Sequence, residues 1–140
     1  VSVTIITDAD FTTAQKNQAM KWENSTYPNA TRLRNPTNRY NCHSYAWYSQ
    51  SSTNNVWMDY PQAYMSDGSY SNATNWSARV NARIFYPGAT IYDSHSGIVT
   101  KASSTWSTSI VTSKWGEKSL MSHVATDCPY SYYGARFYYR

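Results

Sequence analysis

The chain has 140 residues, of which 41% are hydrophobic, 16% aromatic and only 14% charged, with a net charge of +4. This length suits one domain, residues 1–140, and no stretch reaches the roughly 20 apolar residues that span a bilayer, which excludes membrane insertion. The charge favours a mildly anionic partner such as a cell-wall polymer, but no Lys/Arg run forms the basic stripe of a nucleic-acid binder.

The N-terminal part of the chain predicts two helices joined by an extended loop. Thr12 followed by Gln15 is a capping-box pattern and predicts a helix over 12–23. Residues 30–40 are expected to form an extended loop. A second helix is expected over 41–49, because asparagine is a strong N-cap residue.

The stretch 50–81 shows no clean period. A short helix is expected near residues 61–65, since proline suits a first helical position. The stretch is rich in aromatic residues, and we expect Trp57, Tyr60 and Tyr64 to line a groove for sugar or peptide. Packing into the core is the alternative role for each of them.

The C-terminal half predicts a series of strands. Its β-branched and aromatic runs are Arg83–Tyr86, Ala89–Tyr92, Ser96–Lys101, Thr108–Trp115 and Ala135–Arg140. The gaps between the middle three fit antiparallel hairpins. Helices therefore precede strands, and the order predicts an α+β fold.

A cysteine at a helix start is the clearest chemical signal in the chain. Asn41 as N-cap makes Cys42 the first helical residue, beside unpaired backbone N–H groups and the positive end of the helix dipole. Both effects favour thiolate and lower a cysteine pKa. The same N–H groups can hold the oxyanion that forms when sulfur attacks a carbonyl. We therefore predict that Cys42 is a nucleophile.

A nucleophilic thiol needs a base that takes and returns its proton. His95 is the best candidate, because it begins a strand whose end is expected to be open. His43 points about 100° around the helix from Cys42 and is expected to support the site from behind or to lie at the surface. His123, in a loop-like segment, is the reserve candidate.

A third group is expected to orient the imidazole ring of the base. Alternation along SIVTSKWG puts Val111, Ser113 and Trp115 on one face of a strand. If that face packs on the core, Ser113 points inward, near His95. Ser113 is therefore the predicted third catalytic residue.

Two other roles for the cysteines remain open. A disulfide between Cys42 and Cys128, the two cysteines of the chain, would leave Cys42 structural. A zinc site would need ligands from the cysteines and histidines, but no CxxC or HxxxH spacing arranges them, so we expect no metal and no cofactor.

The two candidate segments resemble a known superfamily. The run NCHSYAW, residues 41–47, looks like the nucleophile segment of the CHAP and NlpC/P60 cysteine peptidases. PGATIY at 87–92, followed by HSGIV at 95–99, looks like their Pro-Gly strand and His strand, in the same order. Ala89 stands where these families usually have Asp, and Ser113 where Glu, Asn or His is common.

This resemblance implies a papain-like fold, with the Cys42 helix packed on a C-terminal antiparallel sheet. It also implies a thiol peptidase or amidase that cleaves amide bonds in cell-wall peptidoglycan. Tyr40 and Asn41 would then lie at the mouth of the site. The expected partners are peptidoglycan or peptide substrates and anionic wall polymers, and the expected state is a monomer.

The composition of the chain is typical of an exported protein. A chain that starts at Val1 and is rich in Ser, Thr, Asn and Tyr fits a secreted bacterial protein processed from a longer precursor. A non-catalytic binding or toxin-like module on the same scaffold is the alternative. A basic secreted ribonuclease using His95, His123 and Glu117 has no motif support.

Overall fold

A seven-stranded antiparallel sheet dominates the structure, a computed structural model that describes residues 3–73 and 75–140. Its strand order is β2-β8-β7-β6-β5-β9-β4, and β1 pairs with β3 in a separate two-stranded ribbon. The strands are β1 (Val3–Ile5), β2 (Thr31–Arg34), β3 (Val56–Met58), β4 (Ser71–Ala73), β5 (Arg83–Tyr86), β6 (His95–Lys101), β7 (Ile110–Lys114), β8 (Leu120–Val124) and β9 (Arg136–Tyr139). With few helices beside this sheet, the predicted α+β class is confirmed.

The helices are α1 (Thr13–Thr26), α2 (Cys42–Trp47) and α3 (Gln62–Ser66), with 3₁₀ turns at Ile91–Asp93 and Trp106–Thr108. All three predicted helices are present. The capping box between Thr12 and Gln15 closes in both directions at the start of α1. Within the described part of the chain, no helix combines the length and the hydropathy needed to cross a bilayer.

The strand prediction was wrong in several places, one of them the expected loop at 30–40, where Thr31–Arg34 forms β2. Residues 89–92 form a turn and a 3₁₀ helix rather than a strand, and the Thr90 hydroxyl caps that turn by accepting from the Tyr92 N–H at 3.2 Å. Residues 120–124 form β8, where only a loop was expected. Because β8 lies between β2 and β7 and is largely buried, it lacks the in–out alternation that marks a half-exposed strand.

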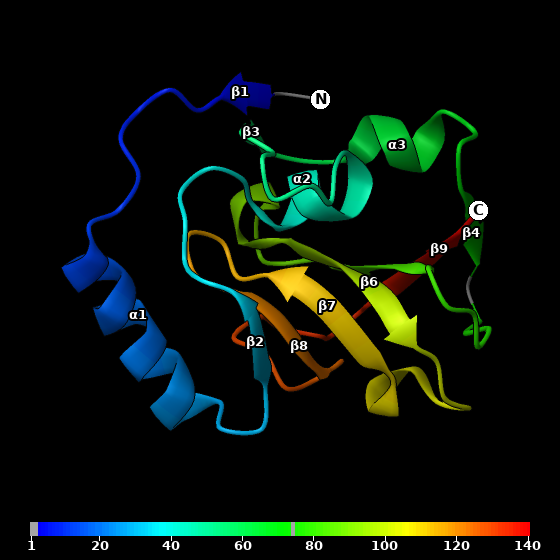
Figure 1. The fold of residues 1–140 in the computed structure, drawn as a ribbon. Helices are drawn as coiled ribbons and strands as arrows, with labels where there is room; N and C mark the ends of the chain where they lie inside the picture. Colours follow the sequence, from blue (N-terminus) through cyan, green and yellow to red (C-terminus); the bar gives the residue numbers. More distant parts are fainter. Residues whose placement is uncertain (1–2, 74) are drawn as a thin grey trace.

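The sheet separates two cores. One, the α2-side core, joins α2 to the sheet and comprises Tyr40, Tyr45, Ala46, Trp47, Met58, Tyr70, Phe85, Ile98, Leu120 and Tyr138. The other, the far core, comprises Ala82, Ile84, Tyr86, Val99, Val111, Trp115, Met121, Ala125, Cys128, Phe137 and Tyr139. In Figure 1, α2 lies over the sheet; β6 is the strand that it contacts most, and it also contacts β3 and β7.

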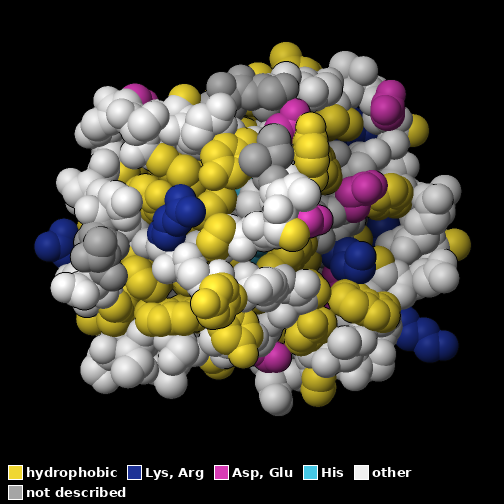
Figure 2. All heavy atoms as spheres, turned by 180° about the vertical axis from the view of Figure 1, so that it is seen from behind, with side chains coloured by type: hydrophobic (Ala, Val, Ile, Leu, Met, Phe, Trp, Pro, Cys, Tyr) yellow, Lys and Arg dark blue, Asp and Glu magenta, His cyan; other side chains and the backbone are white. Residues whose placement is uncertain are grey.

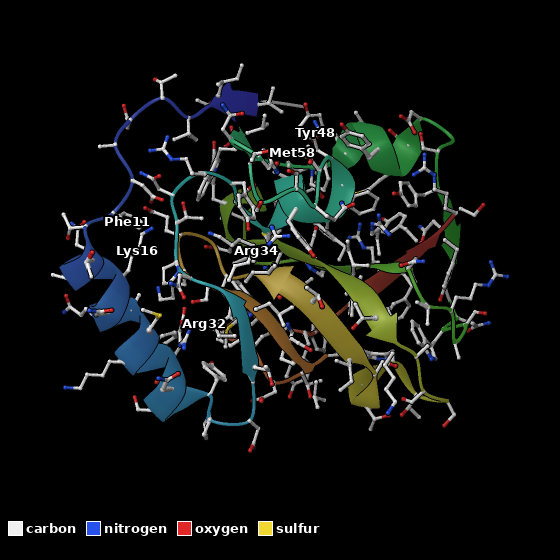
Figure 3. All side chains as sticks on the ribbon, in the orientation of Figure 1. Phe11, Lys16, Arg32, Arg34, Tyr48 and Met58 are labelled. Carbon is white, nitrogen blue, oxygen red and sulfur yellow. The ribbon has the colours of Figure 1, made fainter. Side chains whose placement is uncertain are left out.

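Helix α1 stands apart from α2, at the β2 edge of the sheet (Figure 1). Arg32 on β2 points toward it, as Figure 3 shows, and pairs with the fully buried carboxylate of Glu23 at 2.8 Å. The same carboxylate accepts from the Ser119 N–H at 2.9 Å and from its hydroxyl at 2.7 Å. A buried charge needs such partners, so these bonds tie α1 to the sheet edge.

Hydrophobic side chains cover much of the back of the molecule (Figure 2). In Figure 2, hydrophobic side chains spread across this face among polar ones, and Lys and Arg are scattered rather than grouped. Over the whole surface of the described residues, the large apolar residues with exposed side chains are Val3, Ile5, Trp22, Leu33, Tyr48, Val80, Tyr92, Val124, Tyr132 and Tyr133.

Candidate functional site

Cys42 is the first residue of α2, as predicted, and Asn41 is the N-cap. The Asn41 side chain accepts from the N–H groups of Ser44 at 3.2 Å and Met58 at 3.1 Å, and donates to the Met58 carbonyl at 2.7 Å. These bonds are buried and bind the helix start to β3. The backbone around Cys42 is therefore held rigidly, as a catalytic nucleophile requires.

Opposing forces act on the Cys42 sulfur. The backbone of Ser96, of His43 and of Cys42 itself hydrogen-bonds toward it and favours the thiolate. Burial acts the other way and is the larger effect, so the pKa of the thiol is raised to about 11. The prediction of a lowered pKa is thus wrong for this conformation: only 5% of Cys42 is exposed, and desolvation outweighs the helix start.

A buried lysine supplies positive charge near the sulfur. Lys114 is fully buried, and its ammonium group donates to the carbonyls of Thr37 at 2.7 Å and Gly116 at 2.5 Å. It also lies 5.1 Å from the ring centre of Tyr40. Burial lowers the pKa of Lys114 to about 7, while the charge of an ionised Cys42 raises it. The two groups therefore stabilise each other's charged forms.

His95 begins β6, as predicted, but its ring is fully buried rather than open. The ring of Tyr130 stacks face to face on it, with centroids 3.7 Å apart and an interplanar angle of 5°. Neither ring nitrogen hydrogen-bonds to Cys42 or to any other residue in 3–73 and 75–140. Burial lowers the pKa of His95 well below its usual value, so the ring is neutral at pH 7.

Two links bring His95 close to the Cys42 site. Ser96, the next residue, supplies one of the backbone groups that act on the Cys42 sulfur. Tyr130, whose ring covers His95, also lines the pocket at Cys42. A buried imidazole without a partner costs about 1–3 kcal/mol, and such groups in native structures require an explanation.

Ser113 does not orient His95, contrary to the prediction. Its hydroxyl lies 2.7 Å from Nε2 of His123 and accepts from the Trp115 indole N–H at 3.2 Å. His123 Nδ1 in turn lies 2.7 Å from the carbonyl of Val124. Donors and acceptors balance if His123 carries its proton on Nδ1 and Ser113 donates to Nε2. The partner of Ser113 is therefore His123, the second candidate for the base, which lies on β8, a strand that the sequence did not predict.

His43 is buried rather than at the surface. Its ring nitrogens lie 2.7 Å from the Ser96 hydroxyl and 3.0 Å from the Ser94 hydroxyl, and the ring stacks on Phe85. Burial lowers the pKa of His43 to about 4. The His43 side chain thus contacts the start of β6. Supporting the site in this way is one of the two roles expected for His43.

A pocket of about 110 Å³ opens at Cys42. Its walls are Asn41, Cys42, His43, Trp57, Asp59, Tyr92, Ser94, Gly116 and Tyr130. Trp57 and Asn41 are thus at the pocket, where substrate contacts were expected. Tyr92 is 79% exposed and stands at the rim.

The other predicted substrate contacts lie elsewhere. Tyr40 is 2% exposed, packs in the α2-side core and accepts from Arg34 at 3.1 Å. Tyr64 packs near Trp47, with ring centroids 6.4 Å apart. Tyr60 lies against Phe85 and lines a separate hollow of about 290 Å³.

Sequence reasoning missed Tyr130, Asp59 and the role of Lys114. Tyr130 follows a Cys-Pro pair in a loop, and nothing local indicates that this loop folds over His95. Alternation along β7 did put Lys114 on the face opposite Ser113. Its burial depends on Thr37, which is distant in sequence.

Both cysteines are free thiols, so the disulfide alternative is excluded in this structure. Cys128 lies in the far core, and its thiol is 3.8 Å from the carbonyl of Ala125. Among residues 3–73 and 75–140, no three His, Cys, Asp or Glu side chains gather as a metal site would require.

Comparison with known proteins does not assign the chain to a family: no protein-family model, no curated protein and no solved structure matches it.

Proposed function

We propose that this protein is a papain-like cysteine hydrolase that cleaves amide bonds, with Cys42 as nucleophile and His95 as base. One observation carries the proposal: the Cys42 sulfur, at a helix start and in a pocket, is met by backbone groups that include Ser96, the residue after His95. Neither ring nitrogen of His95 has a hydrogen-bond partner among the residues that the structure describes. Polar groups are left this way at sites that act on a substrate.

The chemistry starts from a neutral pair. With a thiol pKa of about 11 and a neutral imidazole, His95 takes the Cys42 proton as the sulfur attacks the amide carbonyl. The backbone N–H groups at the helix start hold the oxyanion. His95 then gives the proton to the leaving amine, and an acyl-thioester remains on Cys42. Water, deprotonated by His95, cleaves this thioester and regenerates the thiol.

The same proposal requires a rearrangement at the loop that carries Tyr130. The Tyr130 ring covers His95 in this conformation, so it has to move off the imidazole before His95 reaches the sulfur. Opening admits water and substrate and weakens the desolvation that holds the thiol pKa high. Loop movement of this kind is a common way of controlling an active site.

We assign the substrate class by the resemblance of residues 41–47 and 87–99 to the CHAP and NlpC/P60 enzymes. The substrate is then bacterial peptidoglycan or a related peptide, and the protein acts outside the cell that secretes it. The net charge of +4 helps to hold it on anionic wall polymers.

The test is release of new amines from purified cell walls. The wild-type chain and Cys128→Ser, which changes the other buried thiol, are expected to release amines at similar rates. Cys42→Ser and His95→Ala should lower the rate by at least about a hundredfold, as expected when a nucleophile or base is lost. Unchanged release by Cys42→Ser, with all variants folded, would exclude the mechanism.

A non-catalytic binding module is the second candidate, and the closed state of the site favours it: Cys42 and His95 are buried and neutral beneath Tyr130. Sedimentation with cell walls distinguishes the two functions. Binding without amine release, equal in wild type and Cys42→Ser, supports the module.

A further inference from the structure

A larger hollow lies at the other end of α2 from Cys42. It has a volume of about 630 Å³ and shares no lining residue with the Cys42 pocket. Arg83, Arg140, Asn81 and Thr112 supply polar groups to its wall, and Tyr45 and Ile98 supply apolar surface. Such a volume lies in the range of small-molecule sites.

Arg83 is held in place without using all its donors. Its Nε donates to the carbonyl of Ala46 and its Nη1 to that of Asn81, both at 2.6 Å. A guanidinium has five N–H donors, so Nη2 and one Nη1 proton remain without a partner among the described residues. The carbonyls thus orient a partly buried cation and leave one edge unsatisfied.

A second guanidinium, that of Arg140, belongs to the same wall. Arg83 and Arg140 lie over the same Tyr70 ring, at 5.6 and 5.4 Å from its centre. Burial and the charge of Arg140 both lower the pKa of Arg83, which means that the two cations repel each other. The ring offsets this only in part, because a cation–π contact contributes about 0.5–2 kcal/mol.

No carboxylate neutralises this pair in the part of the chain that the structure describes. The ion pairs there are Lys16–Asp10 and Arg32–Glu23. Asp67 is influenced by the charge of Arg140, but it is fully exposed to solvent and forms no ion pair with it. Figure 3 shows a further cation, Arg34, beneath α2, and it donates to the backbone of Gln50 in the wall of the hollow.

Two further polar side chains of the wall, those of Thr112 and Asn81, are free to bind a ligand, whereas Gln50 donates to the Tyr45 carbonyl and Thr100 to the Ile110 carbonyl. The Thr112 hydroxyl and the Asn81 side-chain amide have no hydrogen-bond partner among the described residues. Asn81 is, in that same part of the chain, the one non-glycine residue with a positive φ, 71°. Asparagine adopts this left-handed conformation more readily than other non-glycine residues, so the turn holds Asn81 at the wall at little energetic cost.

We propose that this hollow binds a phosphate monoester, with the phosphate on Arg83 and Arg140 and the organic part against Tyr45 and Ile98. A phosphate monoester carries close to two negative charges at pH 7, which balances two guanidinium groups. Guanidinium also binds phosphate oxygens in a bidentate geometry. Asn81 and Thr112 supply further donors, and the volume leaves room for more than the phosphate.

Calorimetric titration with phenyl phosphate at constant ionic strength tests the site. We expect saturable binding, tighter than for inorganic phosphate and tighter than for benzoate. Equal affinity for inorganic phosphate would show that the apolar wall takes no part, and tighter benzoate binding would show that the ligand is a carboxylate. Either result, or no binding, overturns the proposal.

Two variants locate the binding. Arg140→Gln removes an exposed guanidinium that makes no hydrogen bond within the described chain, so the fold should persist. It should weaken phenyl phosphate binding roughly tenfold. Arg79→Gln is the matched control, because Arg79 also lies over a tyrosine ring, that of Tyr139, but does not line the hollow. Equal effects of the two variants would contradict the assignment.

This site is independent of the proposed hydrolase activity. Cys42→Ser should bind phenyl phosphate as tightly as the wild type, whether or not cell walls are cleaved. Loss of phosphate binding in Cys42→Ser would contradict the assignment to a separate hollow. If the wild type binds phenyl phosphate but releases no amines, that result would contradict the hydrolase proposal and leave the phosphate site unaffected.

Discussion

At the scale of single residues, the neighbours of Cys42 in the sequence predict its position in a helix but not its pKa. Its position after Asn41 makes it the first residue of a helix, and backbone groups do act on its sulfur. Its ionisation, however, depends on how much water reaches the sulfur. Burial reverses the direction of the pKa shift that the helix start alone predicts.

Alkylation of Cys42 measures this directly in a Cys128→Ser background, which leaves one thiol. With a pKa raised from 9.0 to about 11, the folded chain has about a hundredfold less thiolate at pH 7 than the unfolded chain. We expect native labelling by iodoacetamide to be at least that much slower than labelling in denaturant. The native rate should rise about tenfold per pH unit between pH 7 and 10.

The pH profile decides the outcome of the alkylation test. A plateau of the native labelling rate below pH 8 would show that Cys42 is a thiolate in solution and that the buried conformation is not the main one. At pH 7, where Lys114 with its pKa of about 7 is still partly charged, the Lys114→Met variant should label more slowly still, because it removes the charge that favours the thiolate.

At the scale of elements, the β6–β7 pairing depends on one glycine. A Cβ added at Gly97 would lie 2.4 Å from Cγ1 of Val111 and 3.3 Å from Cβ of Ser113. Real Cβ atoms do not come within 2.4 Å of a carbon atom in a distant residue. Because Gly97 has no side chain, Val111 of β7 can pack beside β6 on the side of the far core. The histidine that begins β6 is positioned by the same pairing.

Gly97→Ala is therefore expected to destabilise the protein by about 1–3 kcal/mol, the usual cost of overpacking. Urea unfolding of the single and double variants checks this. Val111→Ala removes the methyl that the new Cβ would meet, so the double variant should be more stable than the sum of the two single effects predicts. Additive effects would place the strain elsewhere.

At the scale of the whole molecule, the burial of every histidine links stability to acid. His43, His95 and His123 are each at most 2% exposed. Burial lowers the pKa of His43 and of His123 from 6.5 to about 4. The unfolded chain therefore binds more protons than the folded chain between pH 6.5 and pH 4, so stability is present above pH 6.5 and is lost as the pH falls through this window.

The free energy of unfolding should fall by roughly 3 kcal/mol for each of these two histidines between pH 6.5 and 4. Denaturant unfolding at several pH values measures the slope, and His123→Gln should reduce it. Asp10→Asn is the control. The pKa of Asp10 is lowered from 3.8 to about 2, so this carboxyl affects stability only at pH values below the window. Stability that does not change between pH 6.5 and 4 would show that the histidines are open to water.

The sequence by itself determined the features that depend on neighbouring residues. The Thr12 and Gln15 capping box, the Asn41 cap and the strands at 83–86 and 95–101 follow from local chemistry and periodicity. The α+β class follows from the order of these elements. The place of Cys42 at a helix start and of His95 at a strand start was predictable for the same reason.

Only the tertiary structure decided the state of the site. Tyr130 covers His95, and Ser113 forms a hydrogen bond with His123. The buried ammonium group of Lys114 donates a hydrogen bond to the carbonyl of Thr37. The first and third of these contacts join segments that are distant in sequence, and the Ser113–His123 contact depends on the pairing of β7 with β8. Burial, which sets the ionisation of Cys42, is likewise a property of the packed molecule, because desolvation depends on every segment that excludes water from the sulfur.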